Sequence, residues 1–227
     1  MFVALLMLLP ALLKKDNEKV ATLLQQNFDT IKSSEDFFED VYYGDVVTTD
    51  IMTPEMHEQI NQNITQFVKV QKNFAKIDTE KVSENIYADV AMLQESLARK
   101  AEAYQKSLDL YNKIYIAYTE EKPEMLDDYL ASDEYAVMTV AERFIEYFND
   151  RNNTLEEISA NGCTLEGHNA SEICVELVED YNDTIESMEQ SHAVPQAIFF
   201  AYDSETSYQD ENLIMPRIEQ IIKEQEG

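Results

Sequence analysis

Few residue patterns in this 227-residue sequence combine the types and spacing that chemistry requires. Glu189 and His192 have the Glu-x-x-His spacing of one half of a di-iron site, which needs a second such pair and two further glutamates on facing helices. The other histidines, His57 and His168, have no glutamate three residues before them. The pattern therefore favours an ordinary helix end at His192, where histidine suits the helix dipole, over a metal centre.

An acidic segment between two apolar stretches offers a second kind of chemistry. Its carboxylates are Asp203, Glu205, Asp210 and Glu211. Oxygen ligands of this kind suit Ca²⁺, although the segment lacks the sixth-position glycine and the ligand spacing of an EF-hand. We treat these residues as a candidate weak Ca²⁺ site, with a solvated acidic loop as the alternative.

Catalytic signatures are missing from the sequence. It contains no Gly-x-Ser-x-Gly, no P-loop and no His-Glu-x-x-His. Carboxylates that could act in pairs on a glycosidic bond are abundant, but nothing selects one pair among them. We therefore predict a protein that is not an enzyme and that uses no cofactor.

Four tyrosines recur along one predicted helix and form a candidate interaction face. They are Tyr104, Tyr111, Tyr115 and Tyr118. Aromatic rings at such spacing offer a stacking platform for a glycan or a peptide. The alternative is a helix core in which the rings are buried and the hydroxyls reach its rim.

The two cysteines, Cys163 and Cys174, lie eleven residues apart. An even cysteine count in an exported chain predicts a disulfide, here one that ties the loop at 161–163 to the following helix. Closing so short a loop contributes roughly 2–3 kcal/mol in the chain-entropy model. Two buried thiols are the alternative. Without a Cys-x-x-Cys or a Cys/His cluster, zinc and thioredoxin-like chemistry have no support.

The elements that position these residues are predicted to be helices. Only 4 glycines occur in the chain, and sheets and barrels need glycine in their tight turns. Apolar residues with helical periodicity predict helices over 16–43, 54–77 and 80–119. The third helix carries five heptads, which is typical of a coiled coil. Pro123 disfavours a helical conformation in the residue before it, so we expect the third helix to end there.

Shorter helices are predicted in the second half of the chain. They cover 124–131, 133–149 and 170–191, and a terminal helix starts at Pro216. Thr154 and Glu157 have the spacing of a capping box, which predicts that a separate short helix opens there. The first three helices, joined by short connections, predict an elongated antiparallel bundle of the all-α class. Dimerisation through the long helix is left open.

The first fifteen residues resemble a signal peptide. Residues 2–13 are apolar and end at Lys14-Lys15, too short a run to span a bilayer but suited to the core of a secretory signal. A positive segment before it and a clear cleavage site are missing, which a start codon assigned too far downstream would explain. We expect export and no membrane span in the mature chain. The alternative is the buried first helix of a cytosolic protein.

Charge divides the chain into two parts. The formal charge of -28 comes from 45 acidic and 17 basic residues, which argues against binding to nucleic acid or to anionic lipid. Residues 1–122 carry 13 basic and 20 acidic residues, and residues 123–227 carry 4 and 25. We therefore predict a signal-like segment over 1–15, a long-helix bundle over 16–122 and an acidic helical region over 123–227. Any partner of the acidic region should be cationic.

The stretch Tyr104–Tyr118 (YQKSLDLYNKIYIAY), followed by Thr154–Ile158 (TLEEI), resembles a family of helical bacterial lipoproteins described as cell-wall-binding. The resemblance covers residues 18–160 and implies an export signal, a helical hairpin with tyrosines at heptad spacing, and no catalytic residues. Residues 9–13 contain no lipobox cysteine, so lipid anchoring is not implied. The acidic second half with its cysteine pair also departs from the family.

These observations predict an exported, non-enzymatic helical protein located outside the cytoplasm. Its expected role is structural or interaction-based at the cell envelope, with a protein or a cell-wall component as partner. The alternative function is a cation- or ligand-binding helical module that uses the acidic C-terminal half.

Overall fold

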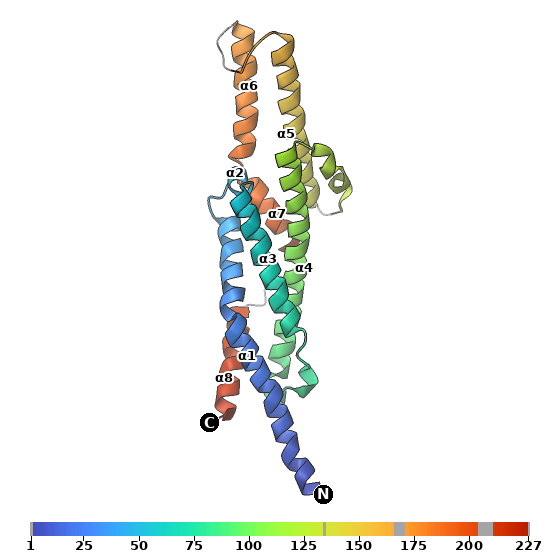
Figure 1. The fold of residues 1–227 in the computed structure, drawn as a ribbon, viewed down its shortest axis with the longest axis vertical. Coiled ribbons are helices and arrows are strands. Elements are labelled where there is room, and N and C mark those ends of the chain that lie inside the picture. The colour runs from blue at the N-terminus through green and yellow to red at the C-terminus, as the bar shows by residue number, and fades with distance from the viewer. Residues whose placement is uncertain (1, 134, 166–170, 204–210, 227) are drawn as a thin grey trace. The chain divides into compact units, whose positions relative to one another are not determined.

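The computed structural model describes residues 2–133, 135–165, 171–203 and 211–226, and every regular element in these ranges is helical (Figure 1). The elements are α1 (Phe2–Tyr43), α2 (Thr48–Ile51), α3 (Pro54–Phe74), the 3₁₀ segment η1 (Thr79–Lys81), α4 (Glu84–Glu120), the 3₁₀ segment η2 (Pro123–Ala131), α5 (Tyr135–Ala160), α6 (Glu172–Glu189), α7 (Ala193–Asp203) and α8 (Glu211–Glu226). The protein is all-α, and its α4 is 37 residues long. This confirms the predicted class and the predicted long helix.

The chain forms two compact units, which we call unit 1 and unit 2. Unit 1 comprises Met1–Glu39, Ile60–Lys106 and Tyr202–Gly227, and unit 2 comprises Asp40–Gln59 and Ser107–Ala201. Both α1 and α4 start in unit 1 and end in unit 2, and α3 does the reverse. The predicted boundary at residue 122 follows charge along the sequence, whereas the units collect segments that are distant in sequence.

Within unit 1, α1 and α4 run parallel. Asn17 Nδ2 donates to Ser83 Oγ at 2.9 Å just before α4 begins. Lys100 Nζ lies 2.7 Å from Glu35 Oε1, a contact that is 18 residues further along the first segment and 17 residues further along the second. Both side chains of this ion pair are about nine-tenths buried, with relative exposures of 11% and 10%. The two contacts set the register of α1 on α4.

In the same unit, α3 runs antiparallel to α4. Gln94, in the third turn of α4, donates its Nε2 to the carbonyl oxygens of Phe74 at 2.7 Å and Ile77 at 3.0 Å. The last carbonyl groups of a helix have no partner within that helix, so Gln94 satisfies the C-terminal end of α3. This contact explains a polar residue on the heptad face of α4.

The buried face of α4 is wider than a two-position heptad seam. Tyr87, the first residue of the predicted heptad seam, is 48% exposed. Ile86, Leu93 and Ile114, which the heptad repeat places outside the seam, are buried. A helix that is covered by several neighbours buries a stripe broader than that of a two-stranded coiled coil. The coiled-coil pattern therefore predicts the helix, but not all of its core positions.

In unit 2, α5 packs against both η2 and α6, and α6 also contacts α2. Thr48 donates its backbone N–H and its Oγ to the Ser191 carbonyl, both at 3.0 Å, and Thr49 Oγ donates to the Glu189 carbonyl at 3.3 Å. These threonines satisfy carbonyl groups at and just beyond the C-terminal end of α6. The start of α2 therefore fixes the end of α6.

Two predicted helix boundaries are wrong. Thr154 does not open a new helix, because α5 continues to Ala160 and the Thr154 hydroxyl donates to the Asp150 carbonyl one turn earlier. The capping-box pattern also fits a helix interior, where threonine commonly bonds in this way. Pro216 lies inside α8, which already begins at Glu211. The short helix predicted over 124–131 is present, as the 3₁₀ segment η2.

Residues 2–13 are helical and continuous with α1. Among the described helices, none combines the length and apolar character that crossing a bilayer demands. The signal-like character of residues 1–15 remains a prediction from the sequence.

Candidate binding groove between α5 and α6

A groove of about 560 Å³ runs along the α5–α6 hairpin in unit 2. The two helices lie side by side in Figure 1. Four carboxylates line the groove, Glu146 and Asp150 from α5 and Asp180 and Asp183 from α6. All four side chains are exposed. These carboxylates are therefore accessible to a ligand.

The groove also has an apolar part. Three of its lining residues are themselves buried, with relative exposures of 7% for Tyr147, 8% for Met188 and 1% for Val194. Of the described lining residues only Arg143 is basic. A ligand with a positive end and an aliphatic stem would match both the carboxylates and this apolar part.

Helical spacing explains why these carboxylates share one groove. Glu146 and Asp150 are four residues apart on α5, and Asp180 and Asp183 are three apart on α6, so each pair lies on one side of its helix. Phe144 and Phe148 alternate with them and are buried in the core. The packing of α5 on α6 then places the two pairs along the same groove.

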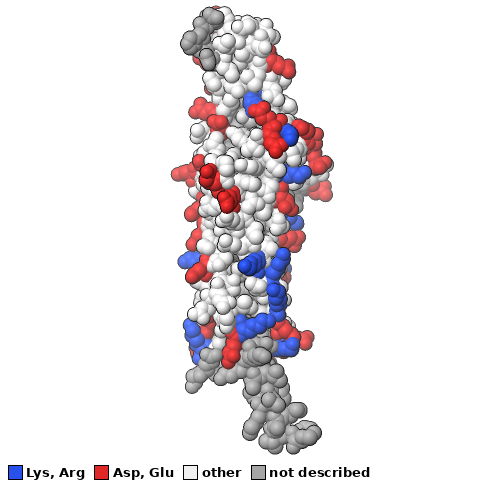
Figure 2. All heavy atoms as spheres, in the orientation of Figure 1, with Lys and Arg blue, Asp and Glu red and all other residues white. Residues whose placement is uncertain are grey.

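The surroundings of the groove are strongly acidic. Unit 2 contains 26 acidic and 4 basic residues, a formal charge of -22, whereas unit 1 contains 19 and 13, a formal charge of -6. α6 alone carries seven carboxylates and no lysine or arginine over 18 residues. On the face drawn in Figure 2, acidic side chains are widespread and basic side chains are interspersed among them.

The charge at the end of α6 opposes its helix dipole. Glu186 and Glu189 occupy the last turn, which has no basic residue. Negative charge is unfavourable at a helix C-terminus, by typically about 0.3–1 kcal/mol per charge at low ionic strength. A positive ligand near this end would relieve that repulsion.

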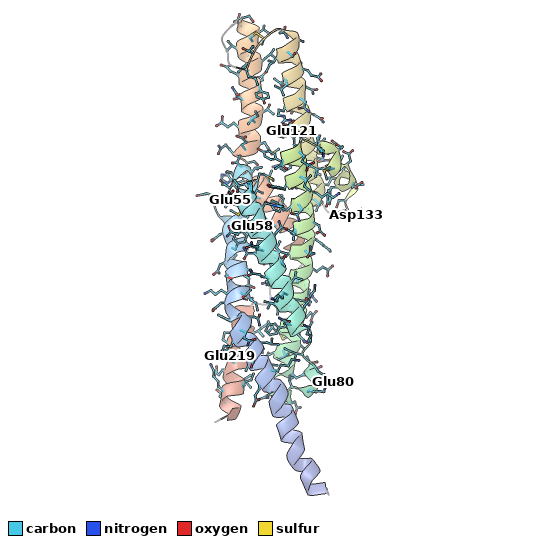
Figure 3. All side chains as sticks on the ribbon, in the orientation of Figure 1. Glu55, Glu58, Glu80, Glu121, Asp133 and Glu219 are labelled. Carbon is cyan, nitrogen blue, oxygen red and sulfur yellow. A yellow bond between two sulfur atoms is a disulfide. The ribbon has the colours of Figure 1, made fainter. Side chains whose placement is uncertain are left out.

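One arginine close to the groove is held by the protein itself. The Arg151 side chain is 13% exposed and its Nη2 lies 3.3 Å from Glu121 Oε2. Glu121, labelled in Figure 3, follows α4 with a positive φ of 55°. The guanidinium also stacks over the ring of Phe148, with its carbon 5.2 Å from the centroid. Arg151 therefore supports the hairpin and does not neutralise the groove.

Two tyrosines beside Arg151 stay neutral at ordinary pH. The rings of Tyr118 and Tyr147 stack with centroids 6.5 Å apart. Burial raises the pKa of both phenols, and Arg151 acts in the opposite direction on each. These hydroxyl groups therefore add no further negative charge to this part of unit 2.

The four tyrosines of the candidate interaction face do not form one exposed surface. Tyr104 is 8% exposed and packs against Phe38 and Phe67, and Tyr111 is fully buried. Tyr115 and Tyr118 are half-buried. Tyr104 and Tyr111 therefore belong to the core, because the face of α4 that carries them is covered by other helices.

His57 has a structural environment. Its ring stacks on Tyr115 with centroids 3.9 Å apart and an interplanar angle of 12°. Its Nε2 lies 2.9 Å from Asn112 Oδ1 and donates to it. The side chain thereby joins the start of α3 to α4 within unit 2.

The Glu189–His192 pair lies at the end of α6. Glu189 is the last helical residue, and the exposed His192 points its Nδ1 to the Val46 carbonyl at 3.2 Å. Among the residues that the structure describes, no three His, Cys, Asp or Glu side chains are placed to hold a metal ion. His168, Glu205 and Asp210 lie outside the described residues, as do the side chains of Asp203 and Glu211. The candidate Ca²⁺ site therefore stays a prediction.

The predicted disulfide is present. Cys163, just after α5, is bonded to Cys174 in the first turn of α6, with Cα atoms 5.5 Å apart. It closes one end of the hairpin, while Thr48 and Thr49 hold the other end of α6. The disulfide thus ties α5 to α6 at one end of the hairpin, and α2 holds the other end of α6.

Comparisons of the chain with protein-family models, with curated proteins and with solved structures found no match. The resemblance to cell-wall-binding lipoproteins therefore rests on the sequence pattern alone.

Sequence reasoning did not find the groove residues. Glu146, Asp150, Asp180 and Asp183 each have a near neighbour at helical spacing, and that is the only local signal. The same signal occurs at many other acidic positions in unit 2, such as Glu172 and Glu176. Only the packing of α5 against α6 distinguishes the groove carboxylates from the other acidic residues with the same spacing.

Proposed function

We propose that the protein is an exported, non-enzymatic helical protein of the cell envelope, and that its acidic unit 2 binds a cationic partner. The groove between α5 and α6 carries this proposal. It joins four exposed carboxylates with the buried residues Tyr147 and Met188. Lysine and arginine side chains, with a charged end and an aliphatic stem, have the complementary chemistry.

Export is supported by two features. The Cys163–Cys174 disulfide is of the kind that persists in oxidising compartments, and residues 2–13 have the composition of a secretory signal. The proposed partner is a protein or a cell-wall component that presents ammonium or guanidinium groups. A charge of -22 on unit 2 would attract such a partner over a distance that shrinks as salt is added.

Binding can be tested by calorimetric titration of the full chain with tetralysine. We compare Glu146→Gln/Asp150→Asn, which removes two charges from the groove, with Glu156→Gln/Glu157→Gln, which removes two exposed charges from the same helix outside it. The groove variant should bind about 3–10-fold more weakly, since each exposed charge pair contributes about 0.2–1 kcal/mol. The control should change affinity less than about twofold. Equal losses in both variants would count against the groove.

Export can be tested separately by fusing the full chain to a reporter that is active only outside the cytoplasm. An active fusion with Cys163 and Cys174 protected from alkylation supports export. An inactive fusion with both thiols reactive contradicts it.

The alternative function, a module that binds a metal cation, draws on the same acidic half. It is separated from the proposal by titration with Ca²⁺. Heat release and a rise in melting temperature at millimolar Ca²⁺ would favour the metal-binding module. Tetralysine binding without a response to Ca²⁺ favours the cationic partner.

A further inference from the structure

The C-terminal part of α3 and the turn after it have a charge opposite to that of the chain as a whole. Residues 59–77 contain no aspartate or glutamate, although 45 of the 227 residues are acidic. At the average frequency of the chain, about four acidic residues would be expected there. The same stretch contains Lys69, Lys72 and Lys76. It is therefore a basic segment in an acidic protein.

Four exposed lysines gather at this segment in unit 1, and we call them the lysine stripe: Lys19, Lys69, Lys72 and Lys76. Lys69 and Lys72 are three residues apart on α3, which places them on one side of the helix. Lys76 follows four residues later, in the turn after α3. Lys19 comes from α1, and its Nζ donates to the Lys76 carbonyl at 3.2 Å. Two segments that are distant in sequence therefore bring their ammonium groups to the same place.

The lysine stripe is not neutralised within its own chain. None of its four ammonium groups forms an ion pair with a carboxylate among the residues that the structure describes. Asp78, close by in sequence, is already paired with Lys81 at 2.7 Å. Arg99 and Lys106 of the same unit each pair with a glutamate one turn away on α4. Because like charges at helical spacing repel one another, the stripe is stabilised when an anion from outside the chain meets it.

The helix dipole explains only part of the lysine stripe. Lysine is favourable near the C-terminal end of a helix, and Lys72 lies in the last turn of α3. The effect falls off within that turn, so it does not account for Lys69 or for Lys19 on another helix. It also does not account for the missing acidic residues over 59–77. An anionic partner accounts for both observations.

One helix of this protein has the complementary pattern. Five exposed carboxylates recur along α6 of unit 2 at alternating spacings of four and three residues. We call them the carboxylate stripe: Glu172, Glu176, Glu179, Asp183 and Glu186. None of them is paired with a basic side chain in the described part of the chain. The lysines over 69–76 have the same spacings of three and four, so two such helices laid side by side bring opposite charges together at each turn.

We propose that the lysine stripe of one copy docks on the carboxylate stripe of a second copy. This inference goes beyond the proposed function, because it assigns a binding surface in unit 1 and names its occupant. The contact joins different surfaces of the two copies, so it is either made twice in a symmetric dimer or repeated from copy to copy. Charges more than about 8 Å apart are largely screened at physiological salt. The local charges of the two stripes therefore outweigh the net negative charge of each copy.

The test follows self-association of the full chain by sedimentation velocity over a range of protein concentrations. Lys69→Glu/Lys72→Glu reverses two charges of the lysine stripe. Lys32→Glu/Lys106→Glu is the matched control, since it makes the same change at two exposed lysines of unit 1 outside the stripe. We expect the native chain to associate at about 0.1 M salt and to dissociate at about 0.5 M, because salt screens the contact. The stripe variant should associate at least about tenfold more weakly, and the control less than about twofold.

An exchange of charge between the two stripes separates a lost contact from a folding defect. Glu176→Lys/Glu179→Lys reverses two charges of the carboxylate stripe, leaves the lining of the α5–α6 groove unchanged and should also weaken association at least about tenfold. Mixing it with Lys69→Glu/Lys72→Glu places opposite charges on facing stripes again, so the mixture should associate as the native chain does. Far-ultraviolet circular dichroism shows whether each variant is folded. If one is not, Lys69→Gln/Lys72→Gln and Glu176→Gln/Glu179→Gln replace the charge reversals and should each weaken association about 3–10-fold.

Three results would each overturn the inference: a monomer mass for the native chain at every concentration, equal losses in the stripe variant and its control, or a mixture of the two charge-reversed variants that stays monomeric. If tetralysine binding still depended on Glu146 and Asp150, the proposed function would stand without it.

Discussion

Asp89 and Arg217 are joined across 128 residues of sequence within unit 1. Arg217 Nε donates to Asp89 Oδ2 at 2.9 Å, and Arg217 Nη2 contacts Asp89 Oδ1. The Asp89 side chain is 6% exposed, whereas that of Arg217 is 60% exposed. The pair attaches α8 to α4, and the guanidinium compensates the buried carboxylate for the loss of water.

Removing Arg217 should therefore cost more stability than its exposure suggests. We expect Arg217→Ala to lower the free energy of unfolding by about 1–3 kcal/mol, because it leaves a buried carboxylate without its cation. Arg99→Ala is the matched control, since Arg99 pairs with Glu95 four residues away and both side chains are more than half exposed. The control should cost less than about 0.5 kcal/mol. Urea denaturation measures both, and equal effects would contradict the role of Asp89.

The Glu35–Lys100 pair should show strong coupling in a double-mutant cycle. The Glu35 and Lys100 side chains are only 10% and 11% exposed, and Lys100 Nζ lies 2.7 Å from Glu35 Oε1. We expect a coupling energy of about 1–3 kcal/mol from Glu35→Gln, Lys100→Met and the double variant. The exposed Glu102–Lys106 pair, at 3.4 Å, provides the comparison and should couple by at most about 0.5 kcal/mol.

Tyr111→Phe should destabilise unit 2. The Tyr111 hydroxyl donates to the Ile51 carbonyl at the end of α2. Its loss leaves a buried carbonyl without a donor, at a cost of about 1–3 kcal/mol. Tyr135→Phe is the control, since Tyr135 is 77% exposed, and should change the free energy of unfolding by less than about 0.5 kcal/mol.

The same substitution should alter stability at alkaline pH. Burial, reinforced by Tyr115, raises the pKa of Tyr111 above its ordinary value of 10.0. A group whose pKa is higher in the folded state contributes stability below its unfolded pKa and loses it as the pH rises through the folded value. Stability should therefore fall above about pH 10, and fall less steeply in Tyr111→Phe. Parallel curves for the two proteins, measured by urea denaturation from pH 8 to 11.5, would refute this explanation.

Reduction of the disulfide should destabilise the α5–α6 hairpin. Cys163 and Cys174 are eleven residues apart, so the chain-entropy model gives a loss of roughly 2–3 kcal/mol. Dithiothreitol should lower the melting temperature of the native protein. Dithiothreitol should not change the melting temperature of the Cys163→Ser/Cys174→Ser variant, which lacks the disulfide and should already melt at the lower temperature. A native protein that is insensitive to full reduction would contradict the prediction.

Local pattern determined much of this fold. The heptad repeat over 80–119 and the scarcity of glycine predict a long helix, and α4 is that helix. The sequence contains only two cysteines, Cys163 and Cys174, and this even count predicts the observed disulfide. These features could be predicted because helix periodicity and cysteine pairing depend on residues that are near in sequence.

Tertiary packing decided the rest. The interior position of Thr154, the burial of Tyr104 and Tyr111, and the cap that Gln94 forms on α3 all depend on which helix covers which face. Tyrosine spacing alone fits a core and a binding face equally well. Only the neighbours of α4 distinguish them.

The groove between α5 and α6 best separates what the sequence predicts from what tertiary packing determines. The sequence by itself determined that the second half of the chain is acidic and that a partner should be cationic. Only the tertiary structure decided that Glu146 and Asp150 face the same groove as Asp180 and Asp183. Charge is a property of composition, whereas a binding site requires side chains about 30 residues apart to converge, and that convergence comes from the packing of two helices.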